Sequence, residues 1–274
     1  MLVPVALLAL VLWAVDAGAA WERVRQARPV PLLGALALAH GVIVASALRW
    51  ADTARRLGHP LPARTALAEY YASSLLNQVL PGGVAGDAVR VWRGRGRGGA
   101  APVARGVVIE RLAGQVAVAA ALVAGVALGG VPGTGRLVAG FVAGLALLLG
   151  ILALWRGFGP DLRRAWGSPR AALVQGALNG LVTGALVAGF WLCAKAVGTP
   201  MGLAEALVLV PVCLAAMLVP VGIGGLGLRE GAAAALWPLA GHPAEAGVAA
   251  ALLFGLAALV AALPGGAVLA RHRS

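Results

Sequence analysis

Two arginines occupy equivalent places in two copies of one short pattern. Residues 81–90 and residues 220–229 both read P-x-G-x-x-G-x-x-x-R, and the second copy follows the first by 139 positions. In each copy we expect the proline to end an incoming half-helix and the glycines to permit the positive φ angles of a sharp turn. A guanidinium group binds phosphate through a planar fork, so Arg90 and Arg229 are the strongest candidates for contacting the phosphate of a lipid head group.

These stretches, the first elbow (81–90) and the second elbow (220–229), predict a binding site for an anion. The half-helix that leaves each elbow begins with free backbone N–H groups and with the positive end of its dipole, and both attract anions. Such backbone is tolerated in a bilayer only where it is buried in protein or lines a wet cavity. The alternative is that the elbows are only structural breaks. The residues predicted to bind substrate are Asn77, Pro81, Gly82, Gly83, Gly86, Asp87, Arg90, Pro220, Gly222, Gly224, Gly225 and Arg229.

A second group of polar residues predicts an ion network that gates this site. Ionisable groups at membrane depth are costly and indicate function by default, although an internal pair near the interface is the alternative. Asp87 and Arg90 stand three residues apart on one helix face and are expected to pair. Neighbouring residues of a helix point in different directions, so Arg229 and Glu230 are expected to find separate partners. The predicted network consists of Glu110, Arg111, Gln115 and Glu230.

Two stripes of residues at four-residue spacing follow the apolar segment 171–195. We expect the polar stripe to form hydrogen bonds between helices, and the glycine stripe to allow a close approach of two helices. The polar stripe is Gln175, Asn179 and Thr183, and the glycine stripe is Gly176, Gly180 and Gly184.

The elements that must hold these residues are membrane-spanning helices. Hydrophobic residues make up 61% of the 274 positions and charged residues only 12%, whereas soluble domains carry about 25% charged residues. The net charge of +12 would favour nucleic-acid binding in a soluble protein. Here the arginines cluster in short loops between apolar runs, which is a topology signal and suits contact with lipid head groups. We therefore expect membrane lipids, and no nucleic acid, as partners.

The sequence contains no pattern for catalysis, for a metal or for a cofactor. Residues 222–227 match G-x-G-x-x-G, but no βαβ unit surrounds them, so the dinucleotide interpretation fails. Cys193 and Cys213 lie inside apolar runs without metal-ligand spacing and are interpreted as core residues. We expect a protein that is not an enzyme and that binds neither metal nor cofactor.

The spacing of the apolar segments predicts an inverted repeat. Shifting the first four segments by the 139-residue offset places them on the last four. Two short segments end at the elbows, and interrupted segments at matching places in two halves point to a transport site. If each short segment enters and leaves the membrane by the same face, each half crosses the membrane three times and the second half is inverted. If the short segments instead cross the membrane fully, the two repeats are parallel. The segments are approximately 2–20, 31–49, 65–80, 105–130, 135–155, 171–195, 203–219 and 245–270.

The expected fold is therefore all-α. We predict one polytopic membrane domain over residues 1–274, in repeats of about 1–133 and 134–274. It has six spanning helices and two re-entrant segments broken at Pro-Gly. Residues 1–20 resemble a signal peptide, but they carry no Lys or Arg before the apolar run and have a counterpart in the second repeat. We expect them to be retained as a helix.

The distribution of arginines predicts that both termini are cytoplasmic. With the N-terminus inside, the basic loops that begin at Arg49, Arg90 and Arg156 all lie in the cytoplasm, and only the loop with Arg23, Arg25 and Arg28 breaks the rule. The expected location is the inner (plasma) membrane of a bacterial cell.

The residues at the elbows resemble the lysylphosphatidylglycerol synthase transmembrane, or flippase-like, family of integral membrane proteins. This family includes the membrane half of the bacterial multiple peptide resistance factor, so the resemblance implies a flippase for an aminoacylated lipid. The family pattern E-R-x-x-D has Gly114 at its last position here, and no aminoacyl-transferase domain follows, so synthase activity is not expected. The resemblance covers most of the chain and rests on Asn77-Gln78-Val79-Leu80-Pro81-Gly82, Gly86-Asp87, Arg90, Glu110-Arg111 and Pro220…Gly224-Gly225-Leu226-Gly227…Glu230.

These observations together predict a lipid translocase. It would move a phospholipid or a polyprenyl-phosphate-linked lipid, with an anionic or zwitterionic head group, between the leaflets. Two alternatives stay open: an ion-coupled transporter of a small solute, and a non-catalytic lipid-binding partner of a separate membrane-bound transferase.

Overall fold

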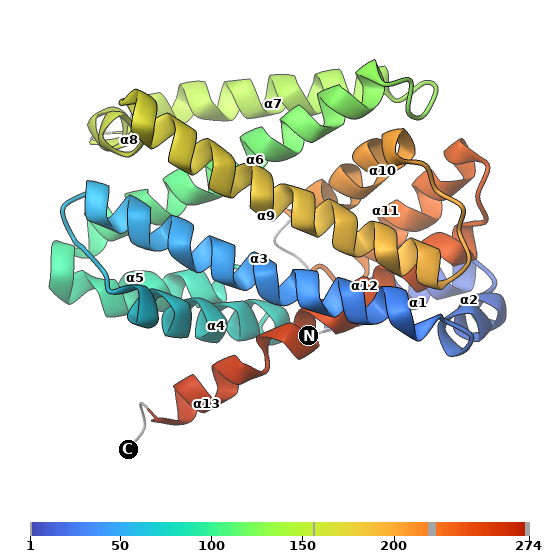
Figure 1. Ribbon diagram of the computed structural model, residues 1–274. Coiled ribbons are helices and arrows are strands. Elements are labelled where there is room, and N and C mark those ends of the chain that lie inside the picture. The colour runs from blue at the N-terminus through green and yellow to red at the C-terminus, as the bar shows by residue number, and fades with distance from the viewer. Residues whose placement is uncertain (1, 156, 219–222, 272–274) are drawn as a thin grey trace.

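The computed structural model describes residues 2–155, 157–218 and 223–271, and these residues fold almost entirely into helices (Figure 1). They contain no β-strand, only an isolated antiparallel bridge between Pro81 and Ile223. In chain order the helices are α1 (Leu2–Ala14), α2 (Ala17–Arg25), α3 (Pro29–Arg56), α4 (Ala63–Val79), α5 (Ala85–Gly98), α6 (Ala100–Ala127), α7 (Gly135–Ala153), α8 (Phe158–Trp166), α9 (Pro169–Ala196), α10 (Leu203–Ala216), α11 (Leu228–Leu236), the 3-10 helix η1 (Trp237–Ala240), α12 (Ala244–Ala262) and α13 (Pro264–Arg271).

Five helical stretches of the described chain are long and apolar enough to cross a membrane. They are α3, α6, α7, α9 and the stretch formed by α12 with α13. The pair α1 and α2 makes a sixth candidate, bent by 100°. The predicted all-α, polytopic membrane fold is therefore confirmed.

The predicted single helix over residues 2–20 is wrong. The chain turns at Asp16, whose side chain accepts a hydrogen bond from the Ala19 N–H at 2.9 Å and so caps the start of α2. An aspartate satisfies the free donors of a helix start, and this favours a new helix over continuation of α1.

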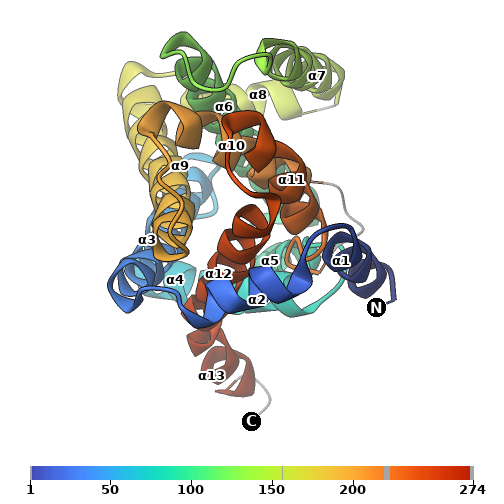
Figure 2. The same cartoon turned by 90° about the vertical axis from the view of Figure 1, so that its right-hand side faces the viewer.

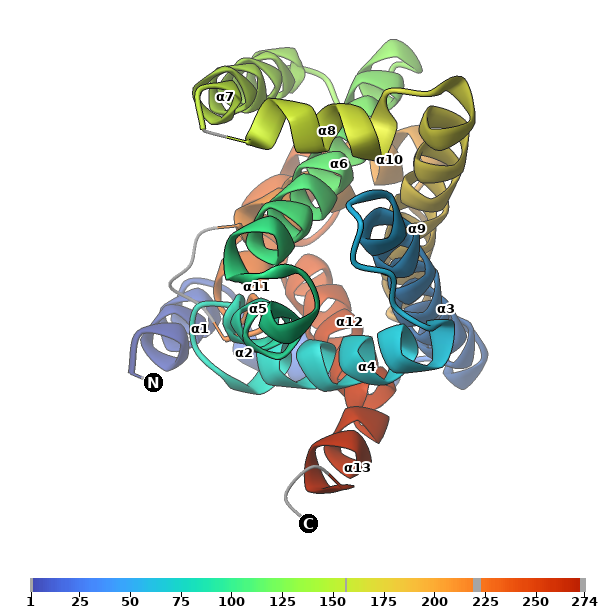
Figure 3. The same cartoon turned by 90° about the vertical axis from the view of Figure 1, so that its left-hand side faces the viewer.

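Helix α7 lies on the outside of the bundle (Figure 3), and several of its large apolar side chains are exposed. Leu147 is 66% exposed and Ile151 is 57% exposed. A continuous apolar surface of this kind is a liability in water but is well solvated by lipid. The outer face of α7 therefore fits a bilayer.

The two halves of the chain form matching series of helices. Helices α3 and α9 both have 28 residues and begin with a proline, Pro29 and Pro169; proline suits this position because the first N–H of a helix lacks a partner in any case. The nine-residue helices α2 and α8 precede them, and α4 and α10 follow them. In Figure 1, α3 runs from right to left and α9 from left to right, packed against each other. This antiparallel match supports the inverted repeat, which stays a prediction.

The chain turns back on itself at the first elbow. Helix α5 packs against α4, and α11 likewise packs against α10. In Figure 1, α3 ends and α6 begins at the same end of the bundle. Helix α4 starts at this end and runs away from it, and α5 runs back to it. This arrangement supports the predicted re-entrant segment, whose depth in a membrane stays a prediction.

The connections that follow α3, α5 and α7 lie at one end of the molecule, on the left in Figure 1. There, the Arg105 Nε of α6 donates to Asp161 of α8 at 2.6 Å. At the other end, Arg23 of α2 pairs with Glu245 of α12 at 3.6 Å, and Figure 2 shows α2 lying across this end against α12. The three loops predicted to be cytoplasmic thus share an end that excludes Arg23. The side of the membrane that this end faces stays a prediction.

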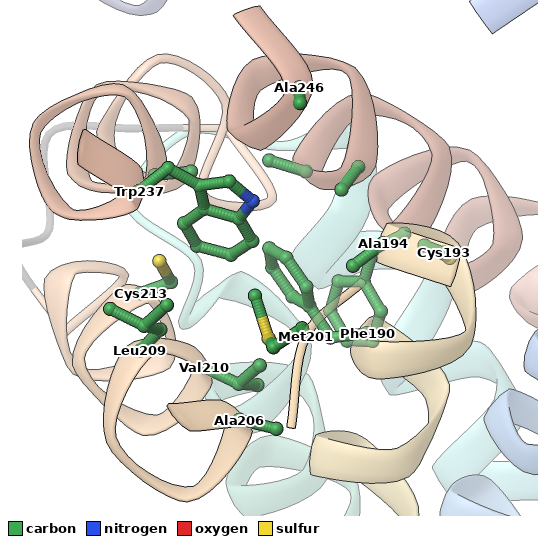
Figure 4. Close-up of a cluster of buried hydrophobic side chains, with 14 of the residues drawn as sticks. Phe190, Cys193, Ala194, Met201, Ala206, Leu209, Val210, Cys213, Trp237 and Ala246 are labelled. Carbon is green, nitrogen blue, oxygen red and sulfur yellow. The ribbon is translucent and has the colours of Figure 1, made fainter. Parts of the chain in front are cut away.

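The largest apolar core lies among α9, α10, η1 and α12 (Figure 4). The Phe190 ring lies 5.8 Å from the ring of Trp237 and 5.0 Å from that of Phe254, measured between centroids. Cys193 and Cys213 are free and fully buried in the same cluster, which confirms their interpretation as core residues.

Two residues of the polar stripe of α9, Gln175 and Asn179, bond across helices as predicted, but the glycine stripe does not pack closely. The Gln175 amide donates to Asp52 of α3 at 2.8 Å. No atom lies within 4 Å of the position that a Cβ would take at Gly176, Gly180 or Gly184, because the buried side of α9 is the side that carries Gln175. The close approach occurs instead at Gly125 of α6, where a Cβ would lie 2.7 Å from Val208 of α10.

Candidate functional site

A cavity of about 370 Å³ lies where the two elbows meet. Its size falls in the range of ligand sites, about 300–1,000 Å³. Apolar residues from α3, α6, α9, α10 and α12 form much of the wall, among them Val42, Val118 and Phe254. The polar residues that line it are Arg49, Ser74, Asn77, Gln78, Glu110, Arg111, Gln115, Thr183 and Arg229.

The elbows touch directly, as expected from the repeat. Pro81 and Ile223 form an antiparallel bridge. The expected positive φ angles occur at Gly82 and Gly83, with +88° and +61°, and at Gly224 and Gly225, with +56° and +79°. Pro220 and Gly222 lie outside the described residues.

Gly224 brings the second elbow onto the end of α4. A Cβ at Gly224 would overlap the Oε1 atom of Gln78 and lie 3.2 Å from its carbonyl oxygen. A Cβ at Gly83, which has a similar φ, would meet nothing within 4 Å. Comparing substitutions at these two glycines therefore distinguishes the cost of the left-handed backbone conformation from the cost of the contact with Gln78.

We expect Gly224→Ala to destabilise the protein more than Gly83→Ala does. Both alanines carry the left-handed penalty of about 1–2 kcal/mol, and only Gly224→Ala must also displace the Gln78 side chain and crowd the Gln78 carbonyl oxygen. Thermal unfolding of the two purified variants in one detergent measures the difference. Equal losses of stability would contradict the close contact between Gly224 and Gln78.

Glu110, which lines the cavity, is the centre of a buried ion network. Its Oε1 accepts hydrogen bonds from Arg49 at 3.1 Å and from the Tyr70 hydroxyl at 2.8 Å. Its Oε2 accepts one from Arg90 at 2.5 Å. The Glu110 side chain is only 2% exposed. Charges so far from water are tolerated only when they are paired and hydrogen-bonded.

Arg90 is enclosed and does not line the cavity. Its guanidinium lies 4.2 Å from the ring centre of Trp50 and 4.7 Å from that of Tyr70. It also pairs with Asp87 at 3.3 Å, as the sequence predicted, and its side chain is 3% exposed. The expected contact between Arg90 and a head group is therefore blocked by its own partners, and Arg90 holds the network together from behind.

Arg111 continues this network to the surface of the cavity. Its Nε donates to Asp87 at 2.6 Å, and its Nη2 donates to the carbonyl of Gly83 at 3.1 Å. The side chain is 43% exposed. Glu110 and Arg111 thus pair with other helices and not with each other.

The second elbow carries its own buried ion pair. Arg229 Nη2 and Glu230 Oε1 lie 2.5 Å apart, so the prediction that these neighbours find separate partners is wrong. The long Arg229 side chain bends back over the start of α11, where Glu230 also accepts the Gly227 N–H at 2.7 Å. The guanidinium rests against Gly255 of α12, where a Cβ would lie 2.9 Å from Arg229 Cζ.

Two residues of the predicted site build the first elbow. The Asn77 Oδ1 accepts the Gly86 N–H at 2.8 Å, so Asn77 satisfies a free donor at the start of α5. Gly86 lies where a Cβ would be 2.6 Å from the Ser73 hydroxyl oxygen and 2.7 Å from the Ser73 carbonyl carbon. Gly86 therefore allows α4 and α5 to pack closely.

Sequence reasoning missed Arg49 as a member of the site. It was assigned to a cytoplasmic loop because the apolar run ends there, but α3 continues to Arg56 and turns Arg49 into the cavity. Arg49 also donates to Asn179 of α9 at 2.6 Å. Of the predicted residues, the cavity is lined by Asn77, Gly83, Glu110, Arg111, Gln115, Gly224, Gly225 and Arg229, while Pro81, Gly82, Gly86, Asp87, Arg90 and Glu230 lie outside its lining.

Comparison with known proteins places the chain in a family. The chain matches none of the curated proteins with which it was compared. The family model of the lysylphosphatidylglycerol synthase TM region matches residues 1–266, which include both elbows and every residue that lines the cavity. The chain therefore belongs to the family of the lysylphosphatidylglycerol synthase TM region.

Proposed function

We propose that the chain is a lipid translocase that moves a phospholipid or a polyprenyl-phosphate-linked lipid between the two leaflets. The observation that carries this proposal is the cavity at the meeting elbows, in which Arg49, Arg111 and Arg229 share a wall with apolar side chains. Membership of the family makes the chain a multi-pass membrane protein with a lipid-related function; the translocase activity is our proposal.

The arginines supply the chemistry that a lipid phosphate needs. A phosphate that crosses a bilayer loses its water, at a cost of several kcal/mol unless polar groups replace that water. Arginine replaces it well because its fork of N–H groups bonds two phosphate oxygens at once. We assign this contact to Arg49, Arg111 and Arg229, which line the cavity, and not to the enclosed Arg90.

The cavity suits a head group and not a whole lipid. At about 30 Å³ per water, a volume of about 370 Å³ corresponds to roughly a dozen water molecules. A polar head group fits this space, whereas two acyl chains do not. The acyl chains would stay in the bilayer, and the half-exposed Arg111 marks the side from which the head group enters.

The repeat supplies a route to alternating access. Two inverted halves that meet at a site are expected to exchange roles, so that the site opens to one leaflet and then to the other. We propose such an exchange in the inner membrane, with both termini cytoplasmic. No covalent step is involved, so the chain would act as a transporter and not as an enzyme.

The proposal is tested with labelled lipids in proteoliposomes. A membrane-impermeant quencher reports the lipid that reaches the outer leaflet, and wild type is compared with Arg111→Gln. We expect the translocation rate of Arg111→Gln to fall about 10–100-fold, because one charged hydrogen-bond partner is worth about 1.5–3 kcal/mol.

Arg164→Gln is the matched control. Arg164 and Arg111 are both partly exposed, and each bonds an aspartate that a second arginine also bonds. Only Arg111 lines the cavity, so Arg164→Gln should translocate like wild type. Equal losses in the two variants would contradict a role of the cavity.

The alternatives give different results in the same proteoliposomes. Ion-dependent uptake of a soluble solute without lipid movement would favour a solute transporter. If no lipid moves and the chain instead co-purifies with a transferase, the lipid-binding partner is favoured.

A further inference from the structure

Every oxygen of the carboxylates around the cavity already accepts a hydrogen bond. Both oxygens of Glu110 are bonded by arginines, one of them also by Tyr70. The Asp87 oxygens bind Arg90 and Arg111. Glu230 binds Arg229 through one oxygen and the Gly227 N–H through the other. An ammonium group that entered the cavity would therefore have to share a carboxylate oxygen with a donor that the protein already supplies.

The same network contains hydrogen-bond donors that lack a strong acceptor. Arg49 lines the cavity, and its Nε is buried without a hydrogen-bond partner. The Nη1 of Arg229 makes only a long bond of 3.5 Å to the carbonyl of Gly224. Gln115 adds a neutral amide whose Oε1 is also without a partner. These groups fit an anionic oxygen and, at Gln115, a hydroxyl.

The charges of the network do not balance. In the network around Glu110, the guanidinium groups of Arg49, Arg90 and Arg111 pair with the carboxylates of Asp87 and Glu110, which leaves one positive charge in excess. The separate pair of Arg229 and Glu230 is neutral. Residues 219–222, outside the described part of this elbow, are Val-Pro-Val-Gly and carry no charge. Arg111 is 43% exposed, but Arg49, Arg90 and Glu110 are nearly inaccessible to water, so a ligand with one negative charge would lower the cost of the excess charge.

We propose that the cavity selects a phosphate ester of a polyol with a net charge of −1, and that it rejects head groups with a free amine, such as ethanolamine or a lysyl ester. This inference rests on the proposed function, because it names the substrate class of the same site. A zwitterionic head group leaves the excess charge in place and sets its ammonium group among guanidinium groups. A phosphodiester of glycerol or of a sugar has neither disadvantage.

Gly114 offers a direct way to change the charge of the wall. It lines the cavity, and the nearest atom to a Cβ at this position is Arg49 Nη1 at 3.8 Å, an ordinary contact. An aspartate there would pair with Arg49 and cancel the excess charge. An asparagine has nearly the same size and no charge, so Gly114→Asp and Gly114→Asn differ in charge alone.

The first test measures binding without translocation. Thermal unfolding of the purified protein is followed with added phosphatidylglycerol, phosphatidylethanolamine or soluble glycerol 3-phosphate. We expect phosphatidylglycerol to raise the apparent Tm of wild type and of Gly114→Asn. It should have little effect on Gly114→Asp, and phosphatidylethanolamine should have little effect on wild type. Equal stabilisation of wild type by both lipids would overturn the inference. Full stabilisation by glycerol 3-phosphate would overturn the assignment to a lipid.

The second test compares translocation of the two lipids in proteoliposomes. Wild type should move phosphatidylglycerol at least about tenfold faster than phosphatidylethanolamine, and this ratio should be at least about tenfold smaller in Gly114→Asp than in Gly114→Asn. Equal ratios in the two variants would overturn the inference even though lipid moves. If neither lipid moves but phosphatidylglycerol alone stabilises wild type, the translocase proposal fails and the selectivity stands.

Discussion

Replacing Glu110 by glutamine is expected to destabilise the folded protein by about 3–5 kcal/mol, the cost of leaving a buried charge without its partner. The Glu110 carboxylate is the shared partner of Arg49 and Arg90, and all three side chains are nearly inaccessible. Glutamine keeps one oxygen that accepts a hydrogen bond, but it supplies no negative charge. Two guanidinium groups would then face each other without a counter-ion between them.

Thermal unfolding in detergent measures this loss. Glu69→Gln is the matched control, because the Glu69 carboxylate is also nearly buried and binds Arg97 at 2.6 Å, but Arg97 is 35% exposed. Water can solvate Arg97 after the change, so a much smaller loss is expected.

A second variant tests whether the stability lost in Glu110→Gln comes from an unpaired charge. The double substitution Glu110→Gln with Arg90→Met removes one of the stranded charges and should regain part of the stability lost by Glu110→Gln alone. If the double variant is less stable than the single one by the full additive amount, Glu110 and Arg90 are not coupled as the 2.5 Å contact implies.

Replacing Gly86 by alanine is expected to destabilise the protein by about 3 kcal/mol, the upper end of the usual cost of overpacking. A Cβ at Gly86 would lie 2.7 Å from the carbonyl carbon of Ser73. Backbone atoms cannot move aside as a side chain can, so α5 must shift away from α4. The shift also breaks the bond from the Gly86 N–H to Asn77 and displaces the first elbow. We therefore expect translocation to be lost even in the protein that still folds.

Gly96→Ala in the same helix is the control. A Cβ at Gly96 meets nothing within 4 Å, and alanine favours a helix over glycine by about 1 kcal/mol. Gly96→Ala should therefore match or exceed wild type in thermal stability. If both alanines leave stability unchanged, the close packing of α4 on α5 is not what positions the elbow.

The lipid that we infer for this chain differs in charge from lysylphosphatidylglycerol, the lipid in the name of its family. A lysyl ester carries amines that need a carboxylate, and the carboxylates of the described network are all occupied. Gly114 stands where the family pattern E-R-x-x-D has an acid, and a Cβ at this position would lie 3.8 Å from Arg49 Nη1. We infer that membership of one family leaves room for different head groups.

The sequence by itself determined the class of the protein and the places where its helices break. Long apolar runs cross a bilayer because of their length alone, and proline with glycine interrupts a helix by local chemistry. The elbows and the spans from α3 to α12 could therefore be predicted. The position of Asp16 as a helix cap is also local, but it was outweighed by the apolar character of the residues around it.

Only the tertiary structure decided which charges meet. Glu110 binds Arg49, 61 positions away, and Arg90, 20 positions away, and no sequence spacing encodes either pair. Arginine and glutamate side chains are long and flexible, so their partners depend on how the helices pack and not on the local pattern. The packing of α3 placed Arg49 in the cavity, and the packing of α5 enclosed Arg90 between two aromatic rings. Two arginines that the sequence presented as a loop residue and a ligand thereby exchanged their expected roles.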